Sequence, residues 1–64
     1  QMFEKGTKLL YTSPYKSKEL HVKDEICIFD YEKQPGKCVV KFKKGTEYIM
    51  RRQVDVKFLR RVTE

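Results

Sequence analysis

Short runs of β-branched and aromatic residues, separated by turn residues, constrain this chain more than any other feature of its sequence. The runs are four to seven residues long and rich in Val, Ile, Tyr, Phe and Thr, a composition typical of strands on a pleated, half-buried surface. No segment keeps a helical apolar stripe over the ~11 residues that a helix prediction needs. The sequence therefore predicts an all-β fold.

Five strands are expected, and three of the four intervals between them contain glycine or proline. A long loop with Pro14 follows the first strand, Pro35-Gly36 makes a later turn, and Lys44-Gly45 makes a tight hairpin. A single 3-10 turn is expected near residues 51–54. The predicted strands span residues 7–12, 24–31, 38–43, 46–51 and 54–62.

The chain has 64 residues, which is enough for one small β-barrel domain over residues 1–64 and too few for a large buried cavity. Gln1 precedes Met2, and we interpret it as a residue left over from cloning. Neither a secretion signal nor an apolar stretch of membrane-spanning length is visible. We therefore expect an intracellular protein, cytoplasmic or nuclear, that is not secreted.

The formal net charge of +6 is distributed unevenly. Six lysines and six acids cancel within residues 1–36, whereas residues 37–61 carry nine bases, including all four arginines, against Glu47 and Asp55. This asymmetry indicates a basic face for a polyanion. The other interpretation is that the charge serves solubility alone.

Residues that could carry catalysis or bind a metal are few. Cys27 and Cys38 are the only cysteines and His21 is the only histidine, so the ligand spacing of a zinc site is absent. Around a Pro35-Gly36 turn the two cysteines would not lie opposite each other, which favours two reduced, partly buried thiols over a disulfide. With no catalytic set and no phosphate-binding glycine loop, we predict a protein that is not an enzyme and uses no cofactor or metal.

The lysine–glycine hairpin predicts which side chains share a face. Counted outward from Lys44-Gly45, Lys41 would pair near Tyr48, and Val39 near Met50. One face is then expected to hold Lys41, Lys43, Tyr48 and Met50. The opposite face, toward the core, is expected to hold Val40, Phe42 and Ile49.

Tyr48 among lysines is typical of a base-stacking platform beside phosphate-binding groups, although a plain Lys–Tyr packing pair gives the same pattern. The arginines come in adjacent pairs, so on a strand only one member of each pair can join a given face. Guanidinium groups suit bidentate contact with phosphate. The candidate nucleic-acid-binding residues are Lys41, Lys43, Lys44, Tyr48, Arg51, Arg52, Lys57, Arg60 and Arg61.

Three segments follow one another in a familiar order: a strand entry at 23–28, a strand with its hairpin at 39–45, and a strand with a short return at 48–54. This order resembles the Src-homology-3-like small barrels, which include Tudor, chromo-barrel, KOW and integrase C-terminal domains. Met50 stands where peptide-binding members carry proline, and the chain has no tryptophan. The resemblance therefore implies the basic, nucleic-acid-binding members rather than readers of proline-rich peptides or methyl-lysine. The nearest alternative fold is the five-stranded oligonucleotide-binding barrel.

Together these features predict a small basic binding module that contacts the phosphates of DNA or RNA through its last three strands. The alternative is a protein-interaction module or small regulator, of the size that phages and mobile elements encode, which docks an acidic protein. Membrane contact is not expected. Formation of a homodimer is a further alternative, because the aromatic residues exceed what one small core can bury. These aromatic residues are Tyr11, Tyr15, Phe29 and Tyr31.

Overall fold

The computed structural model describes residues 3–14 and 24–62. Within these ranges the chain forms five strands and one short 3-10 helix. The elements are β1 (Lys8–Tyr11), β2 (Glu25–Gln34), β3 (Lys37–Lys44), β4 (Glu47–Asp55), η1 (Val56–Phe58) and β5 (Leu59–Arg61). Several residues used in the sequence predictions lie outside the described ranges: Gln1, Met2, Tyr15, His21 and most of the loop after Pro14.

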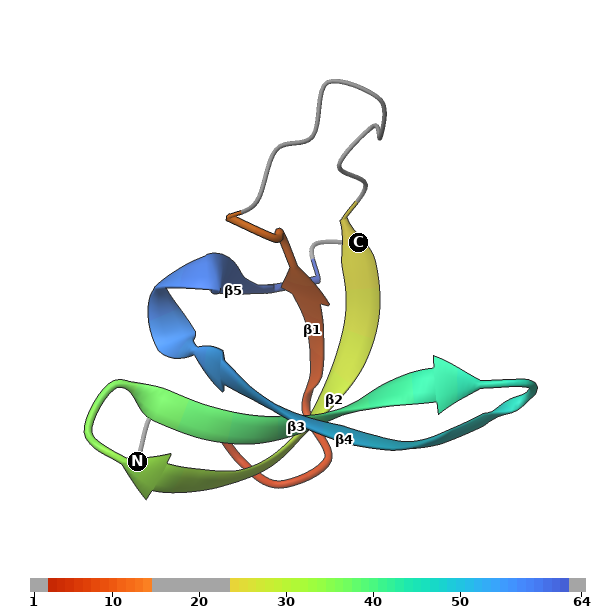
Figure 1. Ribbon diagram of the computed structural model, residues 1–64, viewed down its shortest axis with the longest axis horizontal. Coiled ribbons are helices and arrows are strands. Elements are labelled where there is room, and N and C mark those ends of the chain that lie inside the picture. The colour runs from red at the N-terminus through yellow and green to blue at the C-terminus, as the bar shows by residue number, and fades with distance from the viewer. Residues whose placement is uncertain (1–2, 15–23, 63–64) are drawn as a thin grey trace.

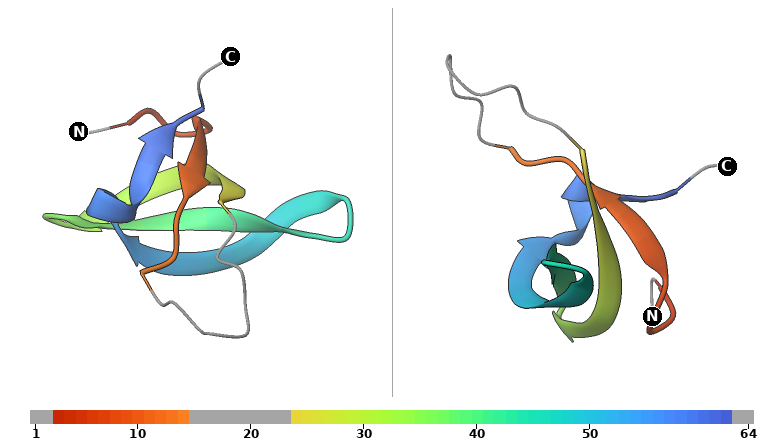
Figure 2. Two further views of the ribbon diagram at one scale, coloured as in Figure 1. Left: turned by 90° about the horizontal axis from the view of Figure 1, so that it is seen from above. Right: turned by 90° about the vertical axis from the view of Figure 1, so that its right-hand side faces the viewer.

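The five strands form one antiparallel sheet in the order β4-β3-β2-β1-β5, which leaves β4 and β5 at its two edges (Figure 1). The predicted all-β class and the number of strands are thereby confirmed. The sheet is strongly twisted, and β1 and β5 cross β3 and β4 at a steep angle (Figure 2). Such twist follows from the right-handed twist of every strand, and it lets a single sheet enclose a core.

Two predicted boundaries are wrong near the end of the chain. The 3-10 turn lies at Val56–Phe58 rather than near residues 51–54, and residues 54 and 55 belong to β4 rather than to the last strand. The cause is that β4 stays paired with β3 as far as Asp55, which lies opposite Lys37. The Asp55 carboxylate then accepts a hydrogen bond of 3.1 Å from the Lys57 backbone N–H, and this cap starts the 3-10 helix.

The predicted Pro35-Gly36 turn is confirmed, whereas the β3–β4 turn lies at Gly45-Thr46, one residue later than predicted, because Lys44 still pairs with Glu47. Gly36 and Gly45 have φ values of +80° and +68°. Residues other than glycine pay a steric penalty in this left-handed region, so glycine permits the β2–β3 and β3–β4 hairpins to reverse sharply.

One face of the sheet, which we call the inner face, carries the hydrophobic core. Its fully buried rings, Phe29 and Phe42, come from neighbouring strands, and Tyr11 packs edge-on against Phe42 with 5.6 Å between ring centres. The remaining core residues are Leu9, Cys27, Cys38, Val40, Val54 and Leu59. With so few buried side chains, a domain of this size keeps a narrow margin of stability.

Candidate functional site

The pairing register sorts the charged side chains onto two faces, because directly opposed residues on paired strands point to the same side. We call the side away from the core the outer face. There Lys8 lies opposite Ile28, Ile28 opposite Lys41, and Lys41 opposite Arg51. These residues form one row across β1, β2, β3 and β4. Three cations separated in the chain are thus aligned on one surface.

A second row lies beside the first on the outer face. Arg60 lies opposite Leu10, and Leu10 lies opposite Ile26. Lys43 also points outward, and it lies opposite Tyr48. The Lys43 Nζ is 5.8 Å from the centre of the Tyr48 ring, so the predicted pairing of a lysine with this tyrosine is a cation–π contact.

A β-bulge in β4 determines which residues of that strand reach the outer face. Phe42 lies opposite Met50, and Lys43 lies opposite Tyr48, which leaves Ile49 as an extra residue on β4. A bulge of this kind puts two successive side chains on the same side of the strand and resets the alternation beyond it.

The register predicted from the hairpin is wrong for two reasons. The turn lies at Gly45-Thr46, one residue later than predicted, which shifts the partners on β4 by two residues, and the bulge shifts them by one more. Lys41 therefore lies opposite Arg51 and not near Tyr48, and Val39 is likewise not near Met50. Met50 therefore leaves the predicted basic face for the inner one. The sequence gives no local signal for a bulge, since no glycine interrupts β4.

The prediction that Ile49 points into the core is also wrong. Ile49 is the unpaired residue of the bulge and is 58% exposed, and the adjacent Met50 is 41% exposed. The β3–β4 hairpin projects beyond the rest of the sheet (Figure 1), so its end has no core to cover.

The first arginine pair is divided between the two faces. Arg51 is on the outer face, whereas Arg52 lies opposite Val40 on the inner face. The Arg52 guanidinium carbon is 5.5 Å from the centre of the Phe42 ring. It covers a core aromatic residue through a cation–π contact instead of joining the basic row.

The second pair is divided in the same way. Arg61 lies opposite the buried Leu9, and its guanidinium carbon is 5.1 Å from the centre of the Phe3 ring. Arg60 is on the outer face, where it donates to the Thr12 hydroxyl at 2.8 Å and pairs with Asp24. The hydrogen bond from Thr12 and the pairing with Arg60 lower the pKa of the Asp24 carboxyl from its usual value.

Arg51 is held by a buried acid. Asp30 is 3% exposed, and its Oδ2 lies 3.4 Å from the Arg51 Nε. Its Oδ1 lies 3.5 Å from the Lys5 Nζ and accepts no hydrogen bond from any described residue. Asp30 sits at a second irregularity, between the Phe29–Val40 pair and the next pair on β2 and β3, which turns its side chain toward these cations.

The contact with Asp30 leaves most of the Arg51 guanidinium available to a ligand. The Arg51 side chain is 67% exposed. Because Nε makes the contact with Asp30, the two Nη groups remain for a bidentate contact with an anion, and among the described residues no acceptor engages them. Asp30 therefore acts as a positioning residue for Arg51.

The remaining predicted residues lie elsewhere. Lys44 follows Lys43 on β3, opposite Glu47, and therefore points to the inner side of the projecting hairpin. Lys57 is on η1, with its Nζ 5.2 Å from the centre of the Phe58 ring. The outer face thus assembles five of the nine predicted residues, namely Lys41, Lys43, Tyr48, Arg51 and Arg60.

Sequence reasoning missed two cations of this surface. Lys8 lies in the row with Lys41, and Lys5 shares Asp30 with Arg51. Both belong to the part of the chain whose charges cancel, so a count of charge per segment hid them. The alternation of Lys8 with the apolar Leu9 places it on the outer side, and the β1–β2 register then identifies its neighbours.

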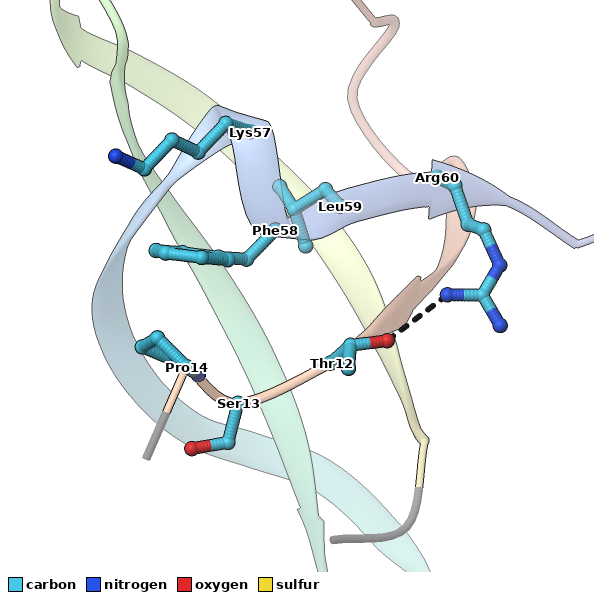
Figure 3. A pocket seen from close by; sticks show the side chains of 7 residues that line it. All are labelled: Thr12, Ser13, Pro14, Lys57, Phe58, Leu59 and Arg60. Carbon is cyan, nitrogen blue, oxygen red and sulfur yellow. Dashed lines mark hydrogen bonds between the residues drawn. The ribbon is translucent and has the colours of Figure 1, made fainter. Parts of the chain in front are cut away.

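Two hollows flank the ridge that Phe58 forms. The first has a volume of about 330 Å³ and lies between Pro14 and Phe58, with Lys57 and Arg60 at its rim (Figure 3). The second, of about 350 Å³, lies between Tyr11 and the end of β4. Both are open, and both lie away from the basic row.

The two cysteines, Cys27 and Cys38, are free and fully buried in the core. Burial raises the pKa of the Cys27 thiol to about 12 and also raises that of Cys38. Such thiols are inert toward solvent reagents. Within the described ranges, no three His, Cys, Asp or Glu side chains gather as metal ligands do.

The structure defines a small all-β domain with one five-stranded antiparallel sheet and a basic outer face. Comparisons with protein-family models, with curated proteins and with solved structures find no match to the chain. In the part of the chain that the structure describes, no helix has the length and apolar character of a membrane span.

Proposed function

We propose that this chain is a small basic binding module that contacts nucleic-acid phosphates through the outer face of its sheet. The observation that carries the proposal is the alignment of Lys8, Lys41 and Arg51 in one row, with Lys43 beside it. Cations fixed on a rigid sheet raise the local concentration of a polyanion and release its counterions on contact. Among the described residues, the acid that forms an ion pair with this row is Asp30, which is buried beside Arg51.

The strand order and the 3-10 helix before the last strand support a more specific proposal for the fold, a Src-homology-3-like small barrel. In that arrangement the outer face is convex, and its side chains spread toward the ligand. The proposed contact residues are Lys8, Lys41, Lys43, Tyr48 and Arg51.

A salt titration with two double variants tests the proposed function. Lys41→Gln/Lys43→Gln removes two outer-face cations, whereas Lys44→Gln/Lys57→Gln removes two cations elsewhere and gives the same net charge. Binding of a labelled duplex and a labelled single strand is followed by fluorescence anisotropy from about 50 mM salt upward. The outer-face variant should reduce the slope of log K against log salt by about 1.8 on duplex or about 1.4 on single strand, since each phosphate contact contributes about 0.9 or 0.7.

The matched control should keep the parental slope. Equal loss of slope in both double variants would show that binding follows net charge and not the outer face. Absence of binding by the parent protein to either nucleic acid at about 50 mM salt would reject the proposed function.

The hollow beside Phe58 favours a second candidate function, docking of an acidic protein segment. Its floor is aromatic and its rim carries Lys57 and Arg60, which suits an apolar side chain flanked by carboxylates (Figure 3). Amide chemical-shift mapping separates the two candidates. An oligonucleotide should shift the amide signals of outer-face residues. An acidic peptide in the hollow should instead shift the amide signals of η1 and of the residues next to Pro14.

A further inference from the structure

The outer face also carries an apolar strip between its cations. Leu10 lies opposite Ile26, and Ile28 lies two residues further along β2, so these three side chains adjoin on β1 and β2. Ile26 is 38% exposed, and the other two are half-buried. An exposed isoleucine in the middle of a charged face is not explained by phosphate contacts alone.

Cations flank the strip on both sides. Lys8 on β1 and Arg60 on β5 form one border. Lys41, Lys43 and Arg51 on β3 and β4 form the other. Neighbouring strands are ~4.8 Å apart, so the β1 and β3 backbones are roughly 10 Å apart across the strip. A ligand that contacts both borders must therefore cover the apolar strip.

Aromatic rings extend this surface at two corners. Tyr48, on β4, lies beside Lys43, on β3. Tyr31, on β2, is 49% exposed and lies opposite Val39 on the outer face. Rings of this kind offer planar apolar surfaces next to cations, the combination that stacks on unpaired bases.

We propose that the outer face binds single-stranded nucleic acid, with phosphates on the Lys41–Arg51 border and bases against the apolar strip and the tyrosines. This inference rests on the proposed function and names its ligand class. A duplex presents charged phosphates outward and hides its base faces in the stack, so contact with the apolar strip would cost the desolvation of its phosphates against the isoleucines. A single strand exposes base faces together with its backbone, and so satisfies both parts of the surface.

Electrostatics alone predicts the opposite preference, which makes the test decisive. A duplex has the higher charge density, so a purely phosphate-binding surface should hold it more tightly than a single strand of equal length. We would compare three labelled ligands in anisotropy titrations at fixed salt: a 15-nucleotide single strand, the corresponding duplex, and an abasic phosphodiester of the same length. The single strand should bind at least about tenfold more tightly than the duplex and the abasic chain, because each base that stacks on the surface adds to the affinity.

Two matched variants locate the base contacts. Ile26→Thr removes apolar surface from the outer face and keeps a β-branched side chain, and it should weaken single-strand binding by about fivefold. Ile49→Thr makes the same change on β4, away from the apolar strip on β1 and β2, and should leave binding unchanged. Tyrosine fluorescence should be quenched by the single strand, since Tyr31 and Tyr48 both lie on the outer face.

The outcomes separate the inference from the proposed function. Duplex binding equal to or tighter than single-strand binding, or an abasic chain that binds as well as the normal one, would overturn the inference and leave phosphate binding standing. Equal effects of Ile26→Thr and Ile49→Thr would also overturn it. Failure of all three ligands to bind at about 50 mM salt would reject the proposed function itself.

Discussion

The buried carboxylate of Asp30 lies 3.4 Å from the Arg51 Nε and also 3.5 Å from the Lys5 Nζ. The two cations come from opposite ends of the chain, and their side chains are 67% and 75% exposed. The acid is thus the only buried member of this group, whereas both cations stay largely in contact with solvent. Removal of the cations and removal of the acid should have unequal consequences.

The double variant Lys5→Gln/Arg51→Gln should lose about 3 kcal/mol of unfolding free energy, because a buried carboxylate without a cation keeps its full desolvation cost. Asp30→Asn should lose less, about 1 kcal/mol, since the two cations it releases are already solvated. Urea denaturation of the parent, the single variants and the double variant measures these values and their coupling. An equal or larger loss in Asp30→Asn would contradict this account.

The two buried thiols provide a test of the core. Cys27 and Cys38 should not react with a water-soluble thiol reagent at pH 8 in the folded protein, and both should react once guanidinium unfolds it. Rapid labelling of either thiol in native buffer would show that the core opens or that the cysteines are exposed.

The raised pKa of Cys27 also predicts alkaline instability. The folded thiol has a pKa of about 12, above the ordinary value of 9.0, so between these values the unfolded chain releases a proton that the folded chain keeps. Stability from this group is complete below about pH 9 and falls as the pH rises toward 12. Cys27→Ala should show a shallower decline over that range than the parent does. Parallel declines in the two proteins would contradict the prediction.

Asp55 makes folding stability depend on pH in the opposite sense, and at acidic pH. The Lys57 backbone N–H and the Lys37 ammonium, 3.0 Å away, lower the pKa of its carboxyl. A depressed folded pKa gives stability that is present above the ordinary value of 3.8 and is lost as the pH falls through the folded pKa. Asp55→Asn keeps a capping oxygen but not the ion pair, whereas Asp55→Ala removes both. At neutral pH the melting temperature should be highest for the parent, lower for Asp55→Asn and lowest for Asp55→Ala. The difference between the parent and the variants should shrink below pH 4.

Gly45 tests the β3–β4 hairpin. Its φ of +68° is a left-handed conformation, although nothing lies within 4 Å of where a Cβ would be. Gly45→Ala should therefore cost about 1–2 kcal/mol through backbone strain and not through a clash. Gly45→Asn should cost less, because asparagine tolerates this region. Equal denaturation midpoints for Gly45→Ala and the parent would contradict the turn geometry.

The features that the sequence predicted correctly are those with local causes. Period-two alternation and glycine turns identified five strands and both hairpins, because side-chain direction and turn conformation depend on neighbouring residues. The same alternation predicted that Val40 and Phe42 face the core, and both are fully buried. The extent of β4 did not follow, because it depends on continued pairing with β3 up to Asp55.

The site was only partly predictable for the same reason. Segment charge selected the last three strands, but it could not include Lys8, whose place in the row depends on β1–β2 pairing. It also could not separate Arg51 from Arg52, since both carry one charge and adjoin in sequence. The tertiary contact with Asp30 and the contact with the Phe42 ring distinguish them.

The single extra residue at Ile49 has a consequence for how this surface could change in evolution. Regular pairing of β4 without the bulge, with Ile49 kept and placed opposite Phe42, would leave the composition and the net charge the same, yet it would shift the rest of β4 by one residue and exchange the faces of Arg51 and Arg52. Arg51 would then lie opposite Val40, where Arg52 now lies, and Asp30 would lose its contact with Arg51. Loss of the bulge would therefore change the ligand-facing side of the domain at several positions at once, whereas most single substitutions there alter one contact.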